Sequence, residues 1–101
     1  MSITKKSGNA NLLTITCYKY GQVIQLYLTF RATGMTVAGG NLFEGTLNKY
    51  LPAIPATGTG YLATRCELML ISASGDITVR NLITDINTGD ELGVHICYVS
   101  A

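Results

Sequence analysis

The stretch QVIQLYLTFR, residues 22–31, decides the fold class of this chain. Large apolar residues stand at every second position, and the positions between them carry Val, Gln, Tyr, Thr and Arg. A period of two residues is that of a β-strand, because successive side chains of a strand point to opposite faces. The stretch therefore predicts a strand whose buried face is formed by Ile24, Leu26, Leu28 and Phe30.

The same period continues on both sides of this strand. Residues 12–20 predict a strand with Leu13, Ile15 and Cys17 on one face, followed by a hairpin turn at Gly21. The region 32–60 is rich in Gly and Pro, and we interpret it as mainly loop, with glycines that form turns. Beyond it we expect strands at 61–71, 76–82 and 91–100, turns at 72–75 and 87–90, and a last inward row of Leu92, Val94, Ile96 and Tyr98.

These strands and turns predict the architecture of the chain. No segment has the 3.6-residue period of a helix. Several short strands separated by turn signals are typical of an all-β fold, either a β-sandwich or a jelly-roll-like barrel. We expect a short polar N-terminal segment at residues 1–10 and one sandwich or barrel domain at residues 11–101.

The composition is poor in charge. Charged residues make up 13% of the 101 residues, against about 25% in typical soluble proteins. Interfaces are depleted of Lys, Glu and Asp, so this surface predicts a homo-oligomer. The net charge of +1 provides no basic patch for a nucleic-acid partner. No apolar stretch approaches the length of a membrane span, so we expect no membrane insertion and no signal peptide.

The residue types that carry chemistry are scattered. Cys17, Cys66 and Cys97 have no paired spacing, which indicates buried thiols and no zinc site or disulfide framework. The single histidine, His95, excludes a two-histidine metal site within one protomer, and no phosphate-binding or dinucleotide motif predicts a cofactor. The carboxylates are scattered along the chain, which argues against the facing pair that a glycosidase needs. We therefore expect a protein that is not an enzyme and has no cofactor or metal.

Three side chains are candidates for ligand contacts on their position alone. Tyr50 and Tyr61 flank the Pro-containing loop, and binding residues concentrate on loops that a rigid scaffold holds. His95 faces away from the inward row of its strand, as a surface or interface group. An inert, hydrogen-bonded strand residue is the alternative for His95, and packing is the alternative for the tyrosines.

Four short motifs resemble a known family. They are the hairpin Tyr-x-Tyr-Gly-x-Val-x-x-Leu at 18–26, the segment from Leu47 to Tyr50-Leu51-Pro52-Ala53, Ser-Gly-Asp-Ile-Thr-Val-Arg at 74–80, and Val-His-Ile-Cys-Tyr-Val at 94–99. From residue 11 onward their order is similar to the C-terminal head domain of bacteriophage tail and baseplate receptor-binding proteins. The chain departs from that pattern in having no fibrous stalk ahead of the domain and no basic residue after Leu51-Pro52-Ala53.

The resemblance implies a β-sandwich or β-barrel head that assembles as a homotrimer and binds host cell-surface polysaccharide. It also implies a place in the virion, at the tail tip, baseplate or fibre, with other tail proteins as partners and assembly in the host cytoplasm. On this hypothesis the tyrosines stack on sugar rings, and the arginines, the carboxylate and the imidazole hydrogen-bond sugar hydroxyls. The predicted saccharide-binding residues are Tyr50, Tyr61, Arg65, Arg80, Asp85 and His95.

Two alternatives stay open at this point. One is a structural virion component, such as a head-fibre, decoration or tail-tip protein, without a small ligand. The other is a saccharide depolymerase whose carboxylates meet across a trimer interface. Glycan dependence separates an adhesin from a structural component, and the release of reducing ends identifies a depolymerase.

Overall fold

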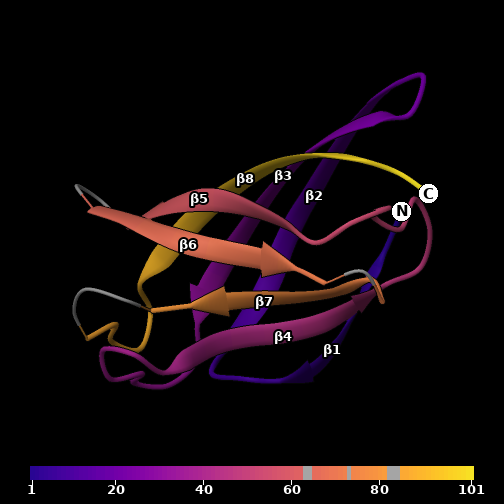
Figure 1. Ribbon diagram of the computed structural model, residues 1–101. Helices are drawn as coiled ribbons and strands as arrows, with labels where there is room; N and C mark the ends of the chain where they lie inside the picture. Colours follow the sequence, from indigo (N-terminus) through magenta and orange to yellow (C-terminus); the bar gives the residue numbers. More distant parts are fainter. Residues whose placement is uncertain (63–64, 73, 82–84) are drawn as a thin grey trace.

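The computed structural model describes residues 1–62, 65–72, 74–81 and 85–101, with the backbone alone at 65–70. Figure 1 shows how the strands of this part of the chain are arranged. No described helix has the length and apolarity of a membrane span. The strands are β1 (Ile3–Ser7), β2 (Ala10–Tyr20), β3 (Val23–Ala32), β4 (Asn41–Leu47), β5 (Ala56–Leu62), β6 (Arg65–Ile71), β7 (Asp76–Arg80) and β8 (Glu91–Val99).

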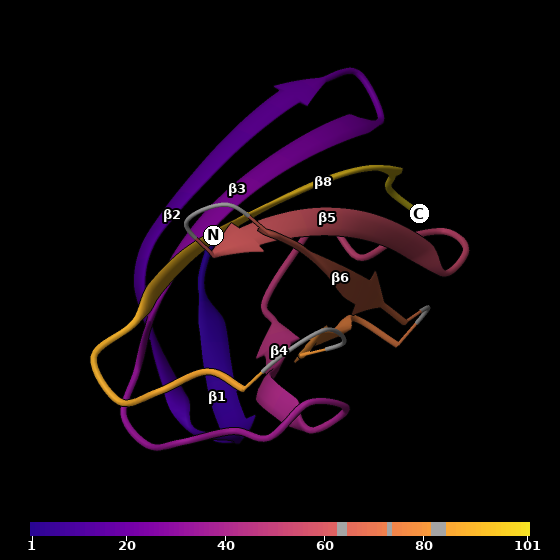
Figure 2. The same ribbon diagram turned by 90° about the vertical axis from the view of Figure 1, so that its left-hand side faces the viewer.

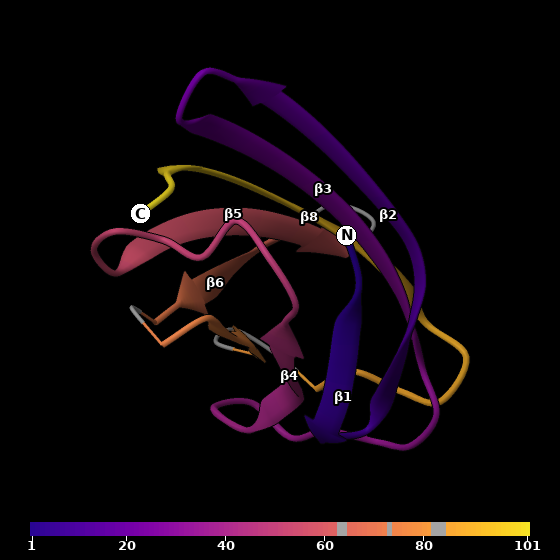
Figure 3. The ribbon, with the colours of Figure 1, turned by 90° about the vertical axis from the view of Figure 1, so that its right-hand side faces the viewer.

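All of these strands belong to one hydrogen-bonded sheet that folds over on itself. The order is β1-β4-β7-β6-β5-β8-β3-β2, and every neighbouring pair is antiparallel. Figure 2 and Figure 3 show the result, in which β2, β3, β8 and β5 form one layer and β1, β4, β7 and β6 form the other. The predicted all-β sandwich or barrel is confirmed.

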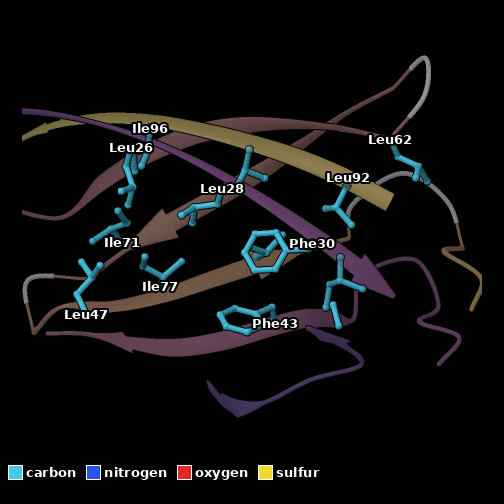
Figure 4. Close-up of a cluster of buried hydrophobic side chains, with 14 of the residues drawn as sticks. Leu26, Leu28, Phe30, Phe43, Leu47, Leu62, Ile71, Ile77, Leu92 and Ile96 are labelled. Carbon is cyan, nitrogen blue, oxygen red and sulfur yellow. The ribbon is translucent and has the colours of Figure 1, made fainter. Parts of the chain in front are cut away.

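The core fills the space between the two layers. The inward rows predicted for 22–31 and 91–100 are confirmed, since Ile24, Leu26, Leu28, Phe30, Leu92, Val94, Ile96 and Tyr98 are all buried. Phe30 of β3 meets Phe43 of β4 across the layers with ring centroids 4.8 Å apart (Figure 4). Aromatic and aliphatic burial of this kind supplies most of the free energy that holds two sheets together.

The region 32–60 is more ordered than predicted. It contains all of β4 and most of β5, and three of its glycines lie inside these strands. A Cβ on Gly58 would collide with the carbonyl oxygen of His95, and one on Gly60 would collide with the side chain of Val94. A Cβ on Gly45 would lie 2.7 Å from Cγ2 of Ile3. These glycines allow close approach of strands, so their interpretation as turn formers is wrong.

Two further strand predictions need correction. The expected single strand 61–71 is two antiparallel strands, β5 and β6, in which Leu62 pairs with Arg65. Within residues 1–10, β1 pairs with β4 at one edge of the sheet, and no strand was predicted there.

The β2–β3 hairpin extends beyond the rest of the sheet in all three views. Its turn at Gly21 lies where the sequence predicts it. The register between β2 and β3 shifts between Leu12 and Thr14, so Leu13 bulges outward and is 46% exposed. The prediction that Leu13 shares one face with Ile15 and Cys17 is therefore wrong, because a bulge reverses the alternation at that point.

Candidate functional site

The outer surface of β2, β3, β8 and β5 carries the densest group of aromatic side chains that point away from the core. Its middle row consists of Thr16, Tyr27, His95 and Thr59, which lie opposite one another in the registers of the four strands. We call this surface the tyrosine face, and it comprises Leu13, Thr14, Thr16, Tyr18, Gln25, Tyr27, Thr29, Thr57, Thr59, Tyr61, Gly93, His95 and Cys97.

Three rings form a continuous contact across this face. The imidazole of His95 stacks on the ring of Tyr27, with centroids 4.4 Å apart and planes inclined by 21°. Tyr18 makes a T-shaped contact with Tyr27, with centroids 6.0 Å apart and planes inclined by 82°. Tyr27 and His95 are directly opposed in the register of β3 and β8, where Cβ atoms lie about 5 Å apart. Tyr18 is a diagonal neighbour of Tyr27, a position still within reach of aromatic side chains. Tyr27 is thereby fixed in place while 41% of it stays exposed.

Tyr61 is held in place by a contact with a glycine on the neighbouring strand. It pairs with Gly93 in the register of β5 and β8, and its ring lies over the backbone of that glycine. A Cβ at position 93 would lie 3.0 Å from the Tyr61 hydroxyl and 3.1 Å from its ring atoms. An aromatic side chain that covers a glycine on the neighbouring strand is a known means of fixing a sheet. The opposite side of Tyr61 is open, and the residue is 60% exposed.

Three hollows follow β8 on the tyrosine face, all of them lined by residues of β5 and β8, and the first two also by residues of β3. The first, of about 290 Å³, is lined by Leu13, Thr29, Tyr61, Glu91, Leu92 and Gly93. The second, of about 300 Å³, is lined by Tyr27, Leu28, Thr29, Thr59, Tyr61, Gly93, Val94 and His95. The third, also of about 300 Å³, is lined by Thr57, Gly58, Thr59, His95, Ile96 and Cys97.

The described side chains of this face carry little charge. At the edge of the first hollow, Glu91 accepts hydrogen bonds from the guanidinium of Arg31, one of them from Nε at 3.1 Å, so the two charges offset each other. The remaining polar groups are mostly hydroxyls, and those of Thr14 and Thr29 share a hydrogen bond. Nε2 of His95 is covered and has no hydrogen-bond partner among the described residues. Aromatic rings and hydroxyls with little net charge suit an uncharged, hydroxyl-rich ligand.

The sequence matches no protein-family model and no curated protein. The structure is similar to the crystal structure of the head domain of the lactococcal phage bIL170, which is described with the receptor-binding domains of lactococcal phages. The TM-score is 0.65 at 18% sequence identity, over 100% of this chain and 96% of that one. The chain shares the fold of that phage head domain. The fold expected from the sequence motifs is thus confirmed by a comparison of whole structures.

The predicted binding residues fall into separate regions of the structure. Tyr61 and His95 both line the second hollow, and Tyr50, Arg80 and Asp85 line none of the three. The side chain of Arg65 lies outside the described residues.

Arg80 and Asp85, which lie away from the hollows, each form a hydrogen bond with a neighbouring residue of the fold. Nε of Arg80, at the end of β7, donates to Oδ1 of Asn41 at 3.2 Å. Asp85 accepts a hydrogen bond from the backbone N–H of Ala38 at 3.0 Å. Arg80 and Asp85 lie at the end of the sheet where β7 leads toward β8. The connection from β4 to β5 lies at the opposite end (Figure 1). Arg80 and Asp85 therefore form no common site with Tyr61 and His95.

Tyr50 lies in the connection from β4 to β5, with a positive φ of 55°. The hydroxyl of Tyr98 donates to the carbonyl oxygen of Tyr50 at 2.7 Å, which ties this connection to β8. Burial raises the pKa of Tyr98 to about 12, and the nearby Cys17 thiol adds to the shift. The ammonium groups of Lys19 and Lys49 lie 5.7 Å and 5.2 Å from the Tyr50 ring centroid. These contacts give Tyr50 a structural role.

The two ring contacts of the tyrosine face include two residues that were not among the predicted binding residues, namely Tyr27 and Gly93. The alternation of residues 22–31 already turns Tyr27 outward, but its meeting with His95 depends on the pairing of β3 with β8. The cysteine prediction is wrong for Cys97, which is exposed because it alternates with the inward row of β8, and Cys17 is half-buried. The side chain of Cys66 lies outside the described residues.

Proposed function

We propose that this chain is the receptor-binding head of a bacteriophage tail protein, which attaches to saccharide on the host cell surface without cleaving it. The observation that carries the proposal is the pair of partly exposed aromatic groups, Tyr27 stacked on His95 and Tyr61 over Gly93, on a face of low charge. The likeness of the fold to a phage receptor-binding head supports the same role. Virion tail proteins are its expected partners, and the tail tip, baseplate or fibre its place in the virion.

We further propose that the head acts as a homotrimer. The low charge of the whole chain supports an assembly, because protomer interfaces are depleted of charged residues. A trimer presents its binding sites together, so modest affinity at each site adds up to firm attachment to a polymeric surface. Sedimentation equilibrium tests this proposal, with a mass of about three protomers as the expected result.

Binding is tested with purified protein and host cell walls. Tyr27→Ala and Tyr61→Ala should each weaken binding about tenfold, the loss expected when an aromatic anchor worth more than 1 kcal/mol is removed. Tyr20→Ala is the matched control, because Tyr20 is 64% exposed at the tip of the β2–β3 hairpin and lines none of the three hollows.

The alternatives give different results in the same assay. Cell walls that release reducing ends on incubation with the protein would indicate a depolymerase. Folded protein that binds no wall preparation from candidate hosts would overturn the receptor-binding proposal in favour of a structural virion component. Equal losses in the Tyr27, Tyr61 and Tyr20 variants would place the binding site outside the hollows.

A further inference from the structure

The three hollows of the tyrosine face form one continuous groove. A further hollow of about 330 Å³ borders the third at Thr57, but its other lining residues include Ile71 and Thr78 of β6 and β7, so it lies off the tyrosine face. The first and second hollows share Thr29, Tyr61 and Gly93 as lining residues. The second and third share Thr59 and His95. The groove therefore runs along β8, bordered by β5 at all three compartments and by β3 at the first two. Tyr61 lies between its first two compartments and His95 between its last two.

The compartments repeat at a regular interval. Along β8 the first adjoins Glu91 and Gly93, the second Gly93 and His95, and the third His95 and Cys97. Each step is two residues of a strand, or about 7 Å at the usual rise. The volumes, about 290, 300 and 300 Å³, are nearly equal. Equal compartments at equal intervals fit a ligand made of similar units in a row.

The lining indicates the chemistry of these units. Each compartment combines a ring or aliphatic surface with at least one threonine hydroxyl, supplied by Thr29, Thr57 or Thr59. The one acidic side chain among the described lining residues is Glu91, which is paired with Arg31. The described lining residues therefore offer a charged sugar unit no unpaired side chain of opposite charge. Hydroxyl-rich units with apolar ring faces suit this lining.

We infer that the groove binds a linear segment of three uncharged sugar units, lying parallel to β5 and β8. This inference rests on the proposed function and specifies the form of the ligand, a run within a neutral polysaccharide chain. Affinity should accordingly rise with chain length up to three units and then level off. Tyr61 and His95, as the walls between compartments, would each contact two successive units.

The test measures dissociation constants for homologous series of neutral oligosaccharides of one to five units, with host cell walls bound in parallel. Each added unit up to the third should tighten binding about tenfold, which is 1.4 kcal/mol per unit, and a fourth unit should add little. Cys97→Tyr fills the third compartment, so affinity should stop rising at two sugar units where the parent's affinity stops rising at three. Leu13→Trp fills the first compartment from the other end and should have the same effect.

Val99→Tyr is the matched control, since Val99 is the next outward residue on β8, is 51% exposed, and lines none of the three hollows. It should leave the plateau at three units. If walls are bound but no series shows a length dependence, or if Cys97→Tyr and Leu13→Trp both keep a plateau at three, the inference is wrong and the proposed function stands. If folded protein binds no walls, the proposed function fails and the inference with it.

Discussion

Gly58→Ala is expected to destabilise the protein by forcing β5 away from β8. The added Cβ would collide with the carbonyl oxygen of His95 and lie 2.6 Å from Cβ and 2.9 Å from Cα of Ile96. The carbonyl oxygen and Cα belong to the backbone, so no rotamer change relieves the contact. The strands must separate locally, at the point where β5 connects the two layers of the sheet.

The size of the effect follows from two opposing terms. Inserting a methyl group into a packed region typically costs 1–3 kcal/mol. Replacing glycine by alanine also restricts the unfolded chain, which returns about 0.4–1 kcal/mol. We expect a net loss of about 1.3 kcal/mol, or a decrease in Tm of roughly 5–10 °C for a domain of this size. Calorimetry at a fixed protein concentration measures it, because association makes Tm depend on concentration.

Gly34→Ala is the control for the change of residue type. A Cβ at position 34 would lie no closer than 3.5 Å to Asn9, an ordinary van der Waals distance. This variant should be as stable as the parent or slightly more stable. A Gly58→Ala protein that melts within about 2 °C of the parent, or a Gly34→Ala protein that loses as much, would refute the reasoning.

Three further predictions concern the core, the buried phenol and the surface ion pair. Phe43→Ala removes the partner of Phe30 and should cost about 3–5 kcal/mol in denaturant unfolding; a loss below 1 kcal/mol would contradict the packing between layers. Since folding raises the pKa of Tyr98 from 10.0 to about 12, its contribution is complete below pH 10 and is lost as the pH rises toward 12. Between pH 10 and pH 12 the free energy of unfolding of Tyr98→Phe should therefore fall less than that of the parent, with a difference of less than about 3 kcal/mol. If both proteins lost stability equally with pH over this interval, the shift of the Tyr98 pKa would be contradicted. Arg31→Ala removes an exposed ion pair and should change stability by less than about 1 kcal/mol, which the same unfolding experiment measures; a larger loss would show that the pair with Glu91 is more than a surface contact.

The sequence predicts those strands whose alternation is complete. In β3 and β8, apolar residues occupy every second position without interruption, and both inward rows are buried as expected. The pattern fails where the period is broken. The bulge at Leu13 reverses the alternation in β2, and Gly45, Gly58 and Gly60 look like turn residues although they permit close strand contacts.

The candidate site was predicted less completely than the fold, for a physical reason. The outward position of Tyr27, Tyr61 and His95 follows from local alternation. Their assembly depends on pairing between β3, β8 and β5, which are far apart in the chain, and no local pattern specifies that register. Arg80 and Asp85 are charged residues of the kind that binds ligands, but they form hydrogen bonds with Asn41 and Ala38 at one end of the sheet.

The position of β8 constrains how this domain is synthesised and folds. β8 follows the other described strands in the chain, yet it lies between β3 and β5 in the sheet. Until its residues leave the ribosome, β3 and β5 each have an unpaired edge, and the two halves of the sheet have no backbone connection through β8. Unpaired edges readily join other chains, and non-local pairing is slow. The sheet should therefore be completed only once β8 has emerged, with nascent chains at risk of aggregation until β8 is inserted.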